Sequence, residues 1–144
     1  MDTKNKTEET SYLLELQTVQ SSAFRILIEA LKEILTDANM EFNETGLRIV
    51  AMDASHTVLV HVKLDSKNFE KFYCPKRIVL GMSMLNLFKL IKTTGNNDTL
   101  AIYVEKNDPN RLGIQINNTD KNTITKYKLN LMDLPEDSIK IPPA

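Results

Sequence analysis

Two stretches of this chain carry the same succession of patterns, and this internal repeat most constrains the fold. In each copy a strand pattern precedes an amphipathic helix pattern, and three further strand patterns follow. The first copy predicts strands and one helix at 12–18, 21–38 (helix), 40–43, 46–52 and 57–65. The second copy predicts them at 69–73 continuing after a proline into 77–81, 83–94 (helix), 99–105, 112–117 and 123–132. The repeat therefore predicts an α+β fold with two strand-helix-three-strand units.

Short polar segments mark the boundaries of these elements. Glu44-Thr45-Gly46 and Asp108-Pro109-Asn110 have the composition of turns. Gly95, followed by two asparagines, is a typical end of a helix. An α+β domain of no particular function also fits this organisation, so the repeat fixes the fold class and leaves the function open.

The composition is typical of one globular domain. Of the residues, 42% are hydrophobic and 26% are charged. A domain of 144 residues is large enough to bury about two-thirds of the surface of its unfolded chain. No apolar run approaches the ~20 residues that span a bilayer. The polar residues 1–10 lack the apolar core of a secretory signal and predict a disordered tail. The single cysteine, Cys74, excludes an intrachain disulfide and fits a reducing compartment.

Positive charge is concentrated on the two predicted helices, although the net charge of the chain is −1. On a helical projection, Glu29, Lys32 and Thr36 lie within about 40° of Arg25. The opposite, core-facing stripe is predicted from six apolar residues: Leu27, Ala30, Leu31, Ile34, Leu35 and Ala38. In the second helix, Lys89 and Lys92 point away from a predicted core set: Met84, Leu87, Phe88, Leu90 and Ile91.

No acidic residue occurs from Ser83 to Gly95, so the exposed face of the second helix is purely positive. A solvated surface is the ordinary explanation of such a face. Contact with DNA is the alternative, and it requires locally clustered positive charge of this kind. The helices alone do not decide between these interpretations.

No arrangement of residues points to catalysis. Asp53, Ser55 and His56 are close neighbours in an extended segment and lack the strand-to-helix elbow of a hydrolase. His56, His61 and Cys74 do not have metal-ligand spacing, and four glycines form no phosphate-binding loop. The sequence therefore predicts a protein that is not an enzyme and has no cofactor.

Three segments, taken in order, resemble a known family. They are the helix-patterned I-E-A-L-K-E-I-L at 28–35, M-D-A-S-H at 52–56, and L-M-D-L-P-E-D-S-I-K-I-P-P at 131–143. Together they resemble the first half of proliferating cell nuclear antigen, a DNA sliding clamp, from about Leu14 to the last residue. The resemblance implies the α+β DNA clamp (processivity) fold, with helices on one face of antiparallel sheets. It also implies a domain at 11–132, preceded by the tail at 1–10, and the start of an interdomain linker at 133–144.

The same resemblance implies a function. Family members are two-domain subunits that form a closed homotrimeric ring around duplex DNA and act in replication and repair. A second domain is therefore expected after Ala144, and the chain is interpreted as an N-terminal fragment, with a single-domain clamp as the other possibility. The implied partners are double-stranded DNA without sequence preference, a DNA polymerase, other proteins with clamp-binding peptides, and a clamp loader. The implied location is the nucleus or another compartment of DNA replication, with no membrane contact.

Site residues follow from the resemblance by position. The DNA-facing residues of the family's helices fall on Arg25, Lys32, Lys89 and Lys92, while one family lysine is Ile26 here. The pocket that binds client peptides corresponds to six residues: Met52, His56, Leu59, Ile139, Ile141 and Pro142. Tyr127 falls at the subunit interface, on the family's edge strand.

Three departures from the family pattern affect the pocket. Ala54 and Thr57 replace a serine and a valine beside His56, and Lys140 replaces a glycine in the linker. Client preference is therefore not carried over. A binding module that presents the pocket without encircling DNA is the alternative function.

Overall fold

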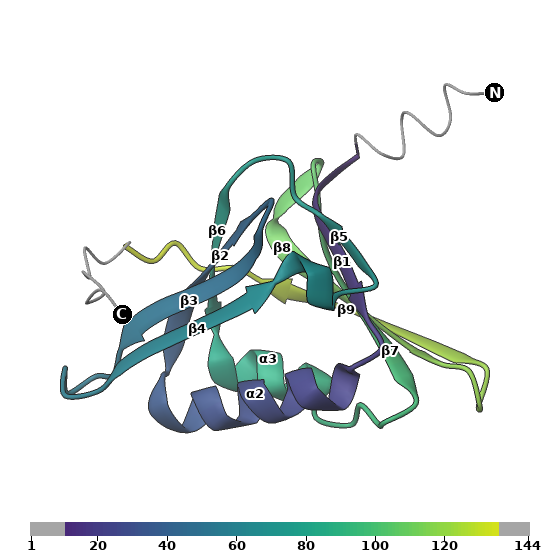
Figure 1. The fold of residues 1–144 in the computed structure, drawn as a ribbon, viewed down its shortest axis with the longest axis horizontal. Coiled ribbons are helices and arrows are strands. Elements are labelled where there is room, and N and C mark those ends of the chain that lie inside the picture. The colour runs from purple at the N-terminus through teal and green to yellow at the C-terminus, as the bar shows by residue number, and fades with distance from the viewer. Residues whose placement is uncertain (1–10, 136–144) are drawn as a thin grey trace.

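The computed structural model of the chain describes residues 11–135, which form two antiparallel sheets and a pair of α-helices (Figure 1). The first elements are β1 (Tyr12–Thr18), α2 (Ser21–Ile34), β2 (Asp37–Asn43), β3 (Gly46–Met52), β4 (Leu59–Asp65) and the short 3₁₀-helix η1 (Ser66–Asn68). They are followed by β5 (Lys71–Tyr73), β6 (Ile78–Ser83), α3 (Met84–Ile91), β7 (Asp98–Glu105), β8 (Asp108–Asn118) and β9 (Thr123–Asn130). The predicted α+β clamp-type fold class is confirmed.

The two units of the repeat exchange their first strands. The strand order is β5-β1-β7-β8-β9 in the five-stranded sheet and β4-β3-β2-β6 in the four-stranded sheet. Thus β1, which opens the first unit, pairs with β7 of the second, and β6, which opens the second, pairs with β2 of the first. Each sheet is therefore completed by a strand from the other half of the chain.

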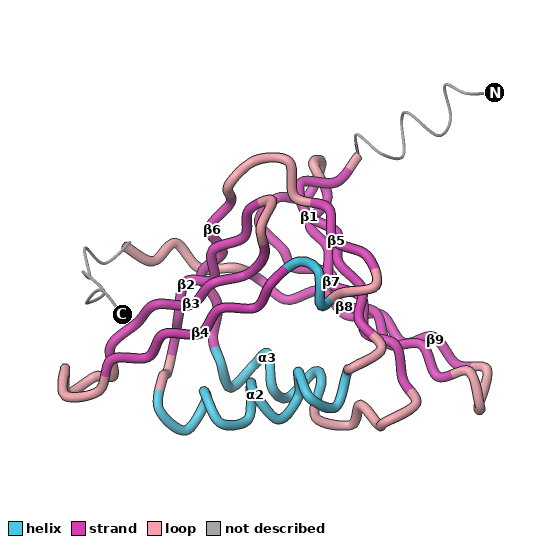
Figure 2. The backbone as a smooth tube through the Cα atoms, in the orientation of Figure 1, coloured by secondary structure: helices cyan, strands magenta, loops and turns pink. Residues whose placement is uncertain are grey.

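Both helices lie side by side on the same side of the two sheets, which lean together above them (Figures 1 and 2). Side chains alternate along the strands, so that one face of each sheet is buried and the other is only partly buried. The core contains Leu14 and Leu16 of β1, Met40 and Phe42 of β2, and Ile114 of β8. The outer faces of both sheets remain open to solvent contacts.

The first helix is shorter than predicted. It ends at Ile34, and Leu35 already has the extended dihedral angles φ −116° and ψ 133°. The prediction that the helix continues to Ala38 is wrong, because residues from Asp37 onward pair with β6, with Ala38 opposite Met82. Tertiary pairing therefore overrides the local helix pattern.

The predicted core-facing stripe of this helix is also partly wrong. The buried apolar positions are Phe24, Ile28 and Leu31, whereas Ala30 is exposed and Ile34 is 42% exposed. The prediction treated Ala38 as helical, although it lies in a strand. Because Ala30 and Ile34 lie on the same helical face as position 38, the predicted stripe was shifted toward them. The second helix agrees better, since Met84, Leu87 and Ile91 are buried as predicted.

Three further element boundaries in the structure differ from the predicted ones. The turn between β7 and β8 is at Lys106-Asn107, and the predicted turn at Asp108-Pro109-Asn110 is wrong because Asp108 pairs with Glu105. Helix α3 ends at Ile91 instead of Thr94. The predicted continuation of one strand past Pro75 is wrong as well, because β5 pairs with β1 and β6 pairs with β2, in different sheets.

Candidate functional site

All four predicted DNA-contacting residues lie on the helix layer. Arg25 and Lys32 belong to α2, Lys89 belongs to α3, and Lys92 is the C-cap residue directly after α3. The two helices are adjacent, and the ammonium group of Lys32 lies 4.9 Å from the ring centroid of Phe88 on α3. Residues seven positions apart share a helix flank, so Arg25 lies on the same α3-facing side as Lys32.

The two cations of α2 are partly withdrawn from solvent. The Lys32 side chain is 19% exposed, and its Nζ donates to Oε1 of Glu33 at 2.5 Å. Lys32 also lowers the pKa of the exposed Glu33 carboxyl, through this hydrogen bond first and its charge second. Arg25 is half-buried, and its Nε atom is buried without a hydrogen-bond partner in the described part of the chain. The outward charge that α2 contributes is therefore small.

The two cations of α3 differ because Lys89 and Lys92 are both exposed. No acidic residue lies in the first turn of α3, and its N-terminus is capped by Ser83, whose hydroxyl oxygen accepts from the Asn86 amide at 3.2 Å. Their ammonium groups are the accessible positive charges of the helix layer. The remaining outward positions are mixed, with Ile26 57% and Leu85 51% exposed and the acidic Glu29 exposed on α2.

Met52 and Leu59 meet on the outer face of the four-stranded sheet. Met52 ends β3, Leu59 begins β4, and they are directly opposite each other in the ladder. Met52 is half-buried and Leu59 is 40% exposed. The third described residue of the predicted pocket, His56, is exposed in the turn between them and has a positive φ of 58°. The fold therefore brings these three residues to one end of the β3–β4 hairpin.

The Asp53 carboxylate organises that turn. Its Oδ1 accepts hydrogen bonds from the backbone amides of Thr57 and Val58 at 2.9 and 3.0 Å, and its Oδ2 accepts from the Ser55 hydroxyl at 2.7 Å. These bonds, that of Ser55 above all, lower the pKa of Asp53. Ser55 and Asp53 thus serve the turn geometry, a role that was not predicted from the sequence, where a catalytic role for Asp53 had been rejected.

Met132, the last residue of the predicted domain, and the first residues of the predicted linker contact two strands of the same sheet. The Met132 amide donates to the Gly81 carbonyl on β6 at 2.8 Å, and Asn39 Nδ2 on β2 donates to the Leu134 and Pro135 carbonyls at 3.4 and 3.2 Å. Sequence reasoning missed both Asn39 and Gly81. A glycine inside an apolar strand pattern was the available signal, since it often marks a close backbone approach. The other predicted pocket residues, Ile139, Ile141 and Pro142, lie outside the described residues.

Tyr127 lies on β9, at the edge of the five-stranded sheet. It is half-buried and opposite Ile114 on β8, which is the one described strand that pairs with β9. On the same strand, Ile124 is 64% exposed. The free edge presents a row of backbone groups that another strand can pair with.

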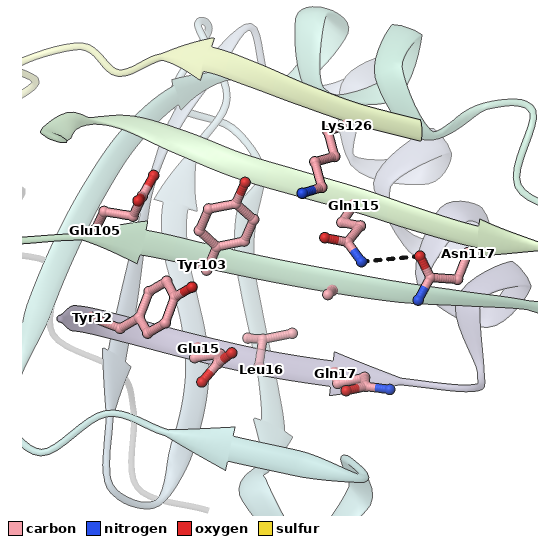
Figure 3. A pocket seen from close by; sticks show the side chains of 10 residues that line it. Tyr12, Glu15, Leu16, Gln17, Tyr103, Glu105, Gln115, Asn117 and Lys126 are labelled. Carbon is pink, nitrogen blue, oxygen red and sulfur yellow. Dashed lines mark hydrogen bonds between the residues drawn. The ribbon is translucent and has the colours of Figure 1, made fainter. Parts of the chain in front are cut away.

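A shallow depression of about 360 Å³ occupies the outer face of the five-stranded sheet (Figure 3). Tyr12 and Tyr103 meet there edge to face, with ring centroids 5.8 Å apart. Its carboxylates are already ion-paired, Glu15 with Lys71 at 2.9 Å and Glu105 with Lys128 at 2.5 Å. The lining also includes Lys126, and the depression contains none of the predicted site residues.

Residues 11–135 contain one free cysteine and no cluster of metal-binding side chains. No three His, Cys, Asp or Glu side chains there are grouped so that they could hold a metal ion. The Cys74 thiol donates to the Lys76 carbonyl at 3.2 Å, and burial raises its pKa to about 11, which keeps it protonated at neutral pH. None of the described helices has the length and apolar character needed to cross a membrane.

The two interlocked sheets, with a helix pair on one side and a linker start on the outer face, define a domain of the processivity-clamp class. Comparison with known proteins gives the family. Residues 13–139 match the family model of the proliferating cell nuclear antigen N-terminal domain, and the chain belongs to this family.

Two relatives illustrate the match. A protein described as probable DNA polymerase sliding clamp 1 of Paramecium bursaria Chlorella virus 1 is 37% identical over 134 residues, covering 93% of this chain and 50% of that protein. Proliferating cell nuclear antigen of Chaetomium thermophilum is 30% identical over 130 residues, covering 90% of this chain and 50% of that protein. The chain thus spans about half the length of these relatives.

Proposed function

We propose that this chain is the N-terminal domain of a DNA sliding clamp, which encircles duplex DNA and holds a DNA polymerase on its template. The match of residues 13–139 to the N-terminal clamp domain carries the proposal. The name of the viral relative, a probable DNA polymerase sliding clamp, supports it. In this role the protein acts by topology and docking and performs no bond chemistry. It works in DNA replication and repair, in the nucleus or another compartment where DNA is copied.

The helix layer is the proposed DNA-facing surface. Lys89 and Lys92 are exposed there and supply flexible ammonium groups for phosphate contacts, while Arg25 and Lys32 on α2 contribute less because they are partly buried. Phosphate contacts carry no sequence information, and they weaken as salt rises. Because this electrostatic attraction is weak and independent of sequence, a ring can remain around the duplex and still move along it.

The outer face of the four-stranded sheet is the proposed docking surface for client proteins. Met52, His56 and Leu59 lie on it, and Ile139, Ile141 and Pro142 of the linker are proposed to complete the socket. Apolar anchors of a client peptide would enter it, with methionine adapting to varied shapes. The linker backbone would pair with the peptide. The proposed clients are a DNA polymerase, repair proteins and the clamp loader.

The edge of the five-stranded sheet is the proposed subunit interface. Strand β9, with Tyr127, would pair with a second domain of a neighbouring subunit. Contacts of this head-to-tail kind close into a ring when both surfaces are present on every subunit. The proposed full-length assembly is a homotrimer of two-domain subunits.

A binding module that presents the docking surface without encircling DNA is the second candidate. The composition of the helix layer favours it, because Ile26 and Leu85 are exposed there and Lys32 is paired with Glu33. Such a layer is less positive than a surface built only to attract DNA.

Retention on closed DNA distinguishes the two functions. The chain joined to a second clamp domain is loaded onto a nicked circular plasmid by a clamp loader, and the plasmid is then cut once. A sliding clamp stays on the circle and leaves after cutting, because it slides off the ends. Equal retention before and after cutting, or none on the circle, would favour the non-encircling module. Leu59→Asp is the control for docking, since it should not be loaded onto the circle if the clamp loader is a client of the docking surface.

A further inference from the structure

After β9 the chain crosses from one sheet to the other, and each step of the crossing is held by a hydrogen bond. The Leu131 amide donates to the Asn110 carbonyl on β8 of the five-stranded sheet at 2.9 Å. The next amide, that of Met132, donates to the Gly81 carbonyl on β6 of the four-stranded sheet at 2.8 Å and forms an isolated antiparallel bridge. The linker therefore begins at a fixed point on the edge of the four-stranded sheet.

Gly81 makes room for this crossing. A Cβ atom at this position would lie 2.5 Å from the Met132 carbonyl oxygen and 3.0 Å from Cγ of Leu134. A distance of 2.5 Å to a backbone atom is too short for any side chain, so the linker could not stay in place over a larger residue. The absence of a side chain at Gly81 is thus required by the path of the linker.

Asn39 holds the next residues of the linker. It lies directly opposite Gly81 in the β2–β6 ladder and is half-buried. Its side-chain Nδ2 lies 3.4 Å from the Leu134 carbonyl oxygen and 3.2 Å from that of Pro135. A side-chain amide has two N–H donors, so one asparagine can serve both carbonyls. Strand β2, which carries Asn39, lies between β6 and β3, and β3 carries Met52 of the docking surface.

From this geometry we infer that Asn39 and Gly81 are positioning residues, which hold the start of the linker and thereby set the affinity of the docking surface for client peptides. The inference rests on the proposed docking function. Ile139 follows Pro135 by four residues, which span at most about 14 Å when fully extended. Fixing Pro135 therefore limits where the linker part of the socket can lie. It also reduces the conformational freedom that the linker loses when a peptide binds.

Peptide binding to the 144-residue chain tests the inference. The probe is a fluorescein-labelled peptide with the aliphatic and aromatic anchors of family clients, followed by anisotropy and stopped-flow dissociation. Asn39→Ala is expected to lower the affinity about fivefold, the usual effect of losing one hydrogen bond, mainly through faster dissociation. Asn39→Asp keeps the size of the side chain and removes both donors, so it should lower the affinity at least as much. Gly81→Ala should do the same by displacing Met132.

Matched controls separate positioning from general stability. Asn43→Ala removes another outward asparagine of β2, whose Oδ1 accepts from the Thr45 amide in the β2–β3 turn, and it should leave the affinity unchanged. Amide exchange at Met132 should accelerate in Asn39→Ala, while the melting temperature changes little. If the wild-type chain binds the peptide and Asn39→Ala and Asn39→Asp bind it equally well, the inference is overturned and the docking function stands. If the wild-type chain binds no peptide, the docking function fails and the inference falls with it.

Discussion

Asp53 determines the shape of the β3–β4 turn, because one carboxylate oxygen accepts from two successive backbone amides, those of Thr57 and Val58. This arrangement places His56 in the left-handed region, at φ 58°. It also keeps Met52 and Leu59 opposite each other at the end of the hairpin. The docking surface thus depends on an acidic residue that touches no client in our proposal.

The first prediction concerns the titration of this carboxyl. The hydrogen bond from Ser55, followed by those from the backbone, lowers the pKa of Asp53 below its ordinary value of 3.8. A depressed pKa means that the carboxylate stabilises the turn above about pH 3.8, and that this contribution is lost as the pH falls through the lower folded pKa. The amides of Thr57 and Val58 should therefore lose protection from exchange only below pH 3.8.

Substitution checks the same assignment at neutral pH. Asp53→Ala should accelerate exchange of the Thr57 and Val58 amides, measured by nuclear magnetic resonance. Asp65→Ala is the control, because Asp65 accepts from the Lys67 amide at the start of η1 and does not touch this turn. Unchanged exchange in Asp53→Ala would show that the turn is held by other contacts.

The two helices contribute unequally to the proposed DNA-facing surface. On α2, Lys32 is paired with Glu33, and Arg25 is half-buried. On α3, Lys89 and Lys92 are exposed, and no acidic residue occurs between Ser83 and Gly95. The two helices therefore differ more in how exposed their basic residues are than in how many basic residues they carry.

The second prediction follows from this difference. In the full-length ring, Lys89→Ala with Lys92→Ala should reduce the salt dependence of DNA binding by up to about two units on a logarithmic plot, one for each lost phosphate contact. Arg25→Ala with Lys32→Ala, a matched pair, should reduce it less, because Lys32 is already paired with Glu33. The measurement is DNA affinity over a series of salt concentrations. A larger effect of the α2 pair would reverse our assignment of the main contacts.

Element boundaries show how far the sequence can predict this fold. The bounds of β1 and β3 agree with the prediction, since strong apolar alternation and the turn at Glu44-Thr45 leave little choice. Helix α2 was predicted too long because Thr36 to Ala38 continue a helical pattern locally. In the fold, Asp37 and Ala38 are held by β6, which is more than forty residues away in the chain. Pairing over such a distance leaves no mark in a local pattern.

The whole molecule is held together by the strand exchange between its two units. Because β1 completes the second sheet and β6 the first, each sheet contains strands from both halves of the chain. The repeat was visible in the sequence, whereas this exchange was not, since pairing partners are not encoded in periodicity. The same limit applies to the site. Met52 and Leu59 were predicted as pocket residues from the family resemblance, whereas Asn39 was not, because its hydrogen bond is to Leu134, 95 positions later in the chain.

The last prediction concerns assembly of the 144-residue polypeptide. Strand β9 offers a free edge with Ile124 exposed, while its lysines, Lys126 and Lys128, discourage indiscriminate pairing between like edges. In our proposal the edge pairs with a second clamp domain, so this polypeptide alone should be a monomer or a weak, concentration-dependent associate. Joining a second clamp domain after Ala144 should yield a trimer, because a head-to-tail ring closes only when both surfaces are present. Light scattering over a concentration series measures both cases, and Ile124→Lys should weaken any residual self-association. A stable closed ring of the 144-residue polypeptide at micromolar concentration would contradict the two-domain assembly, because the β9 edge would then have a partner within the same domain.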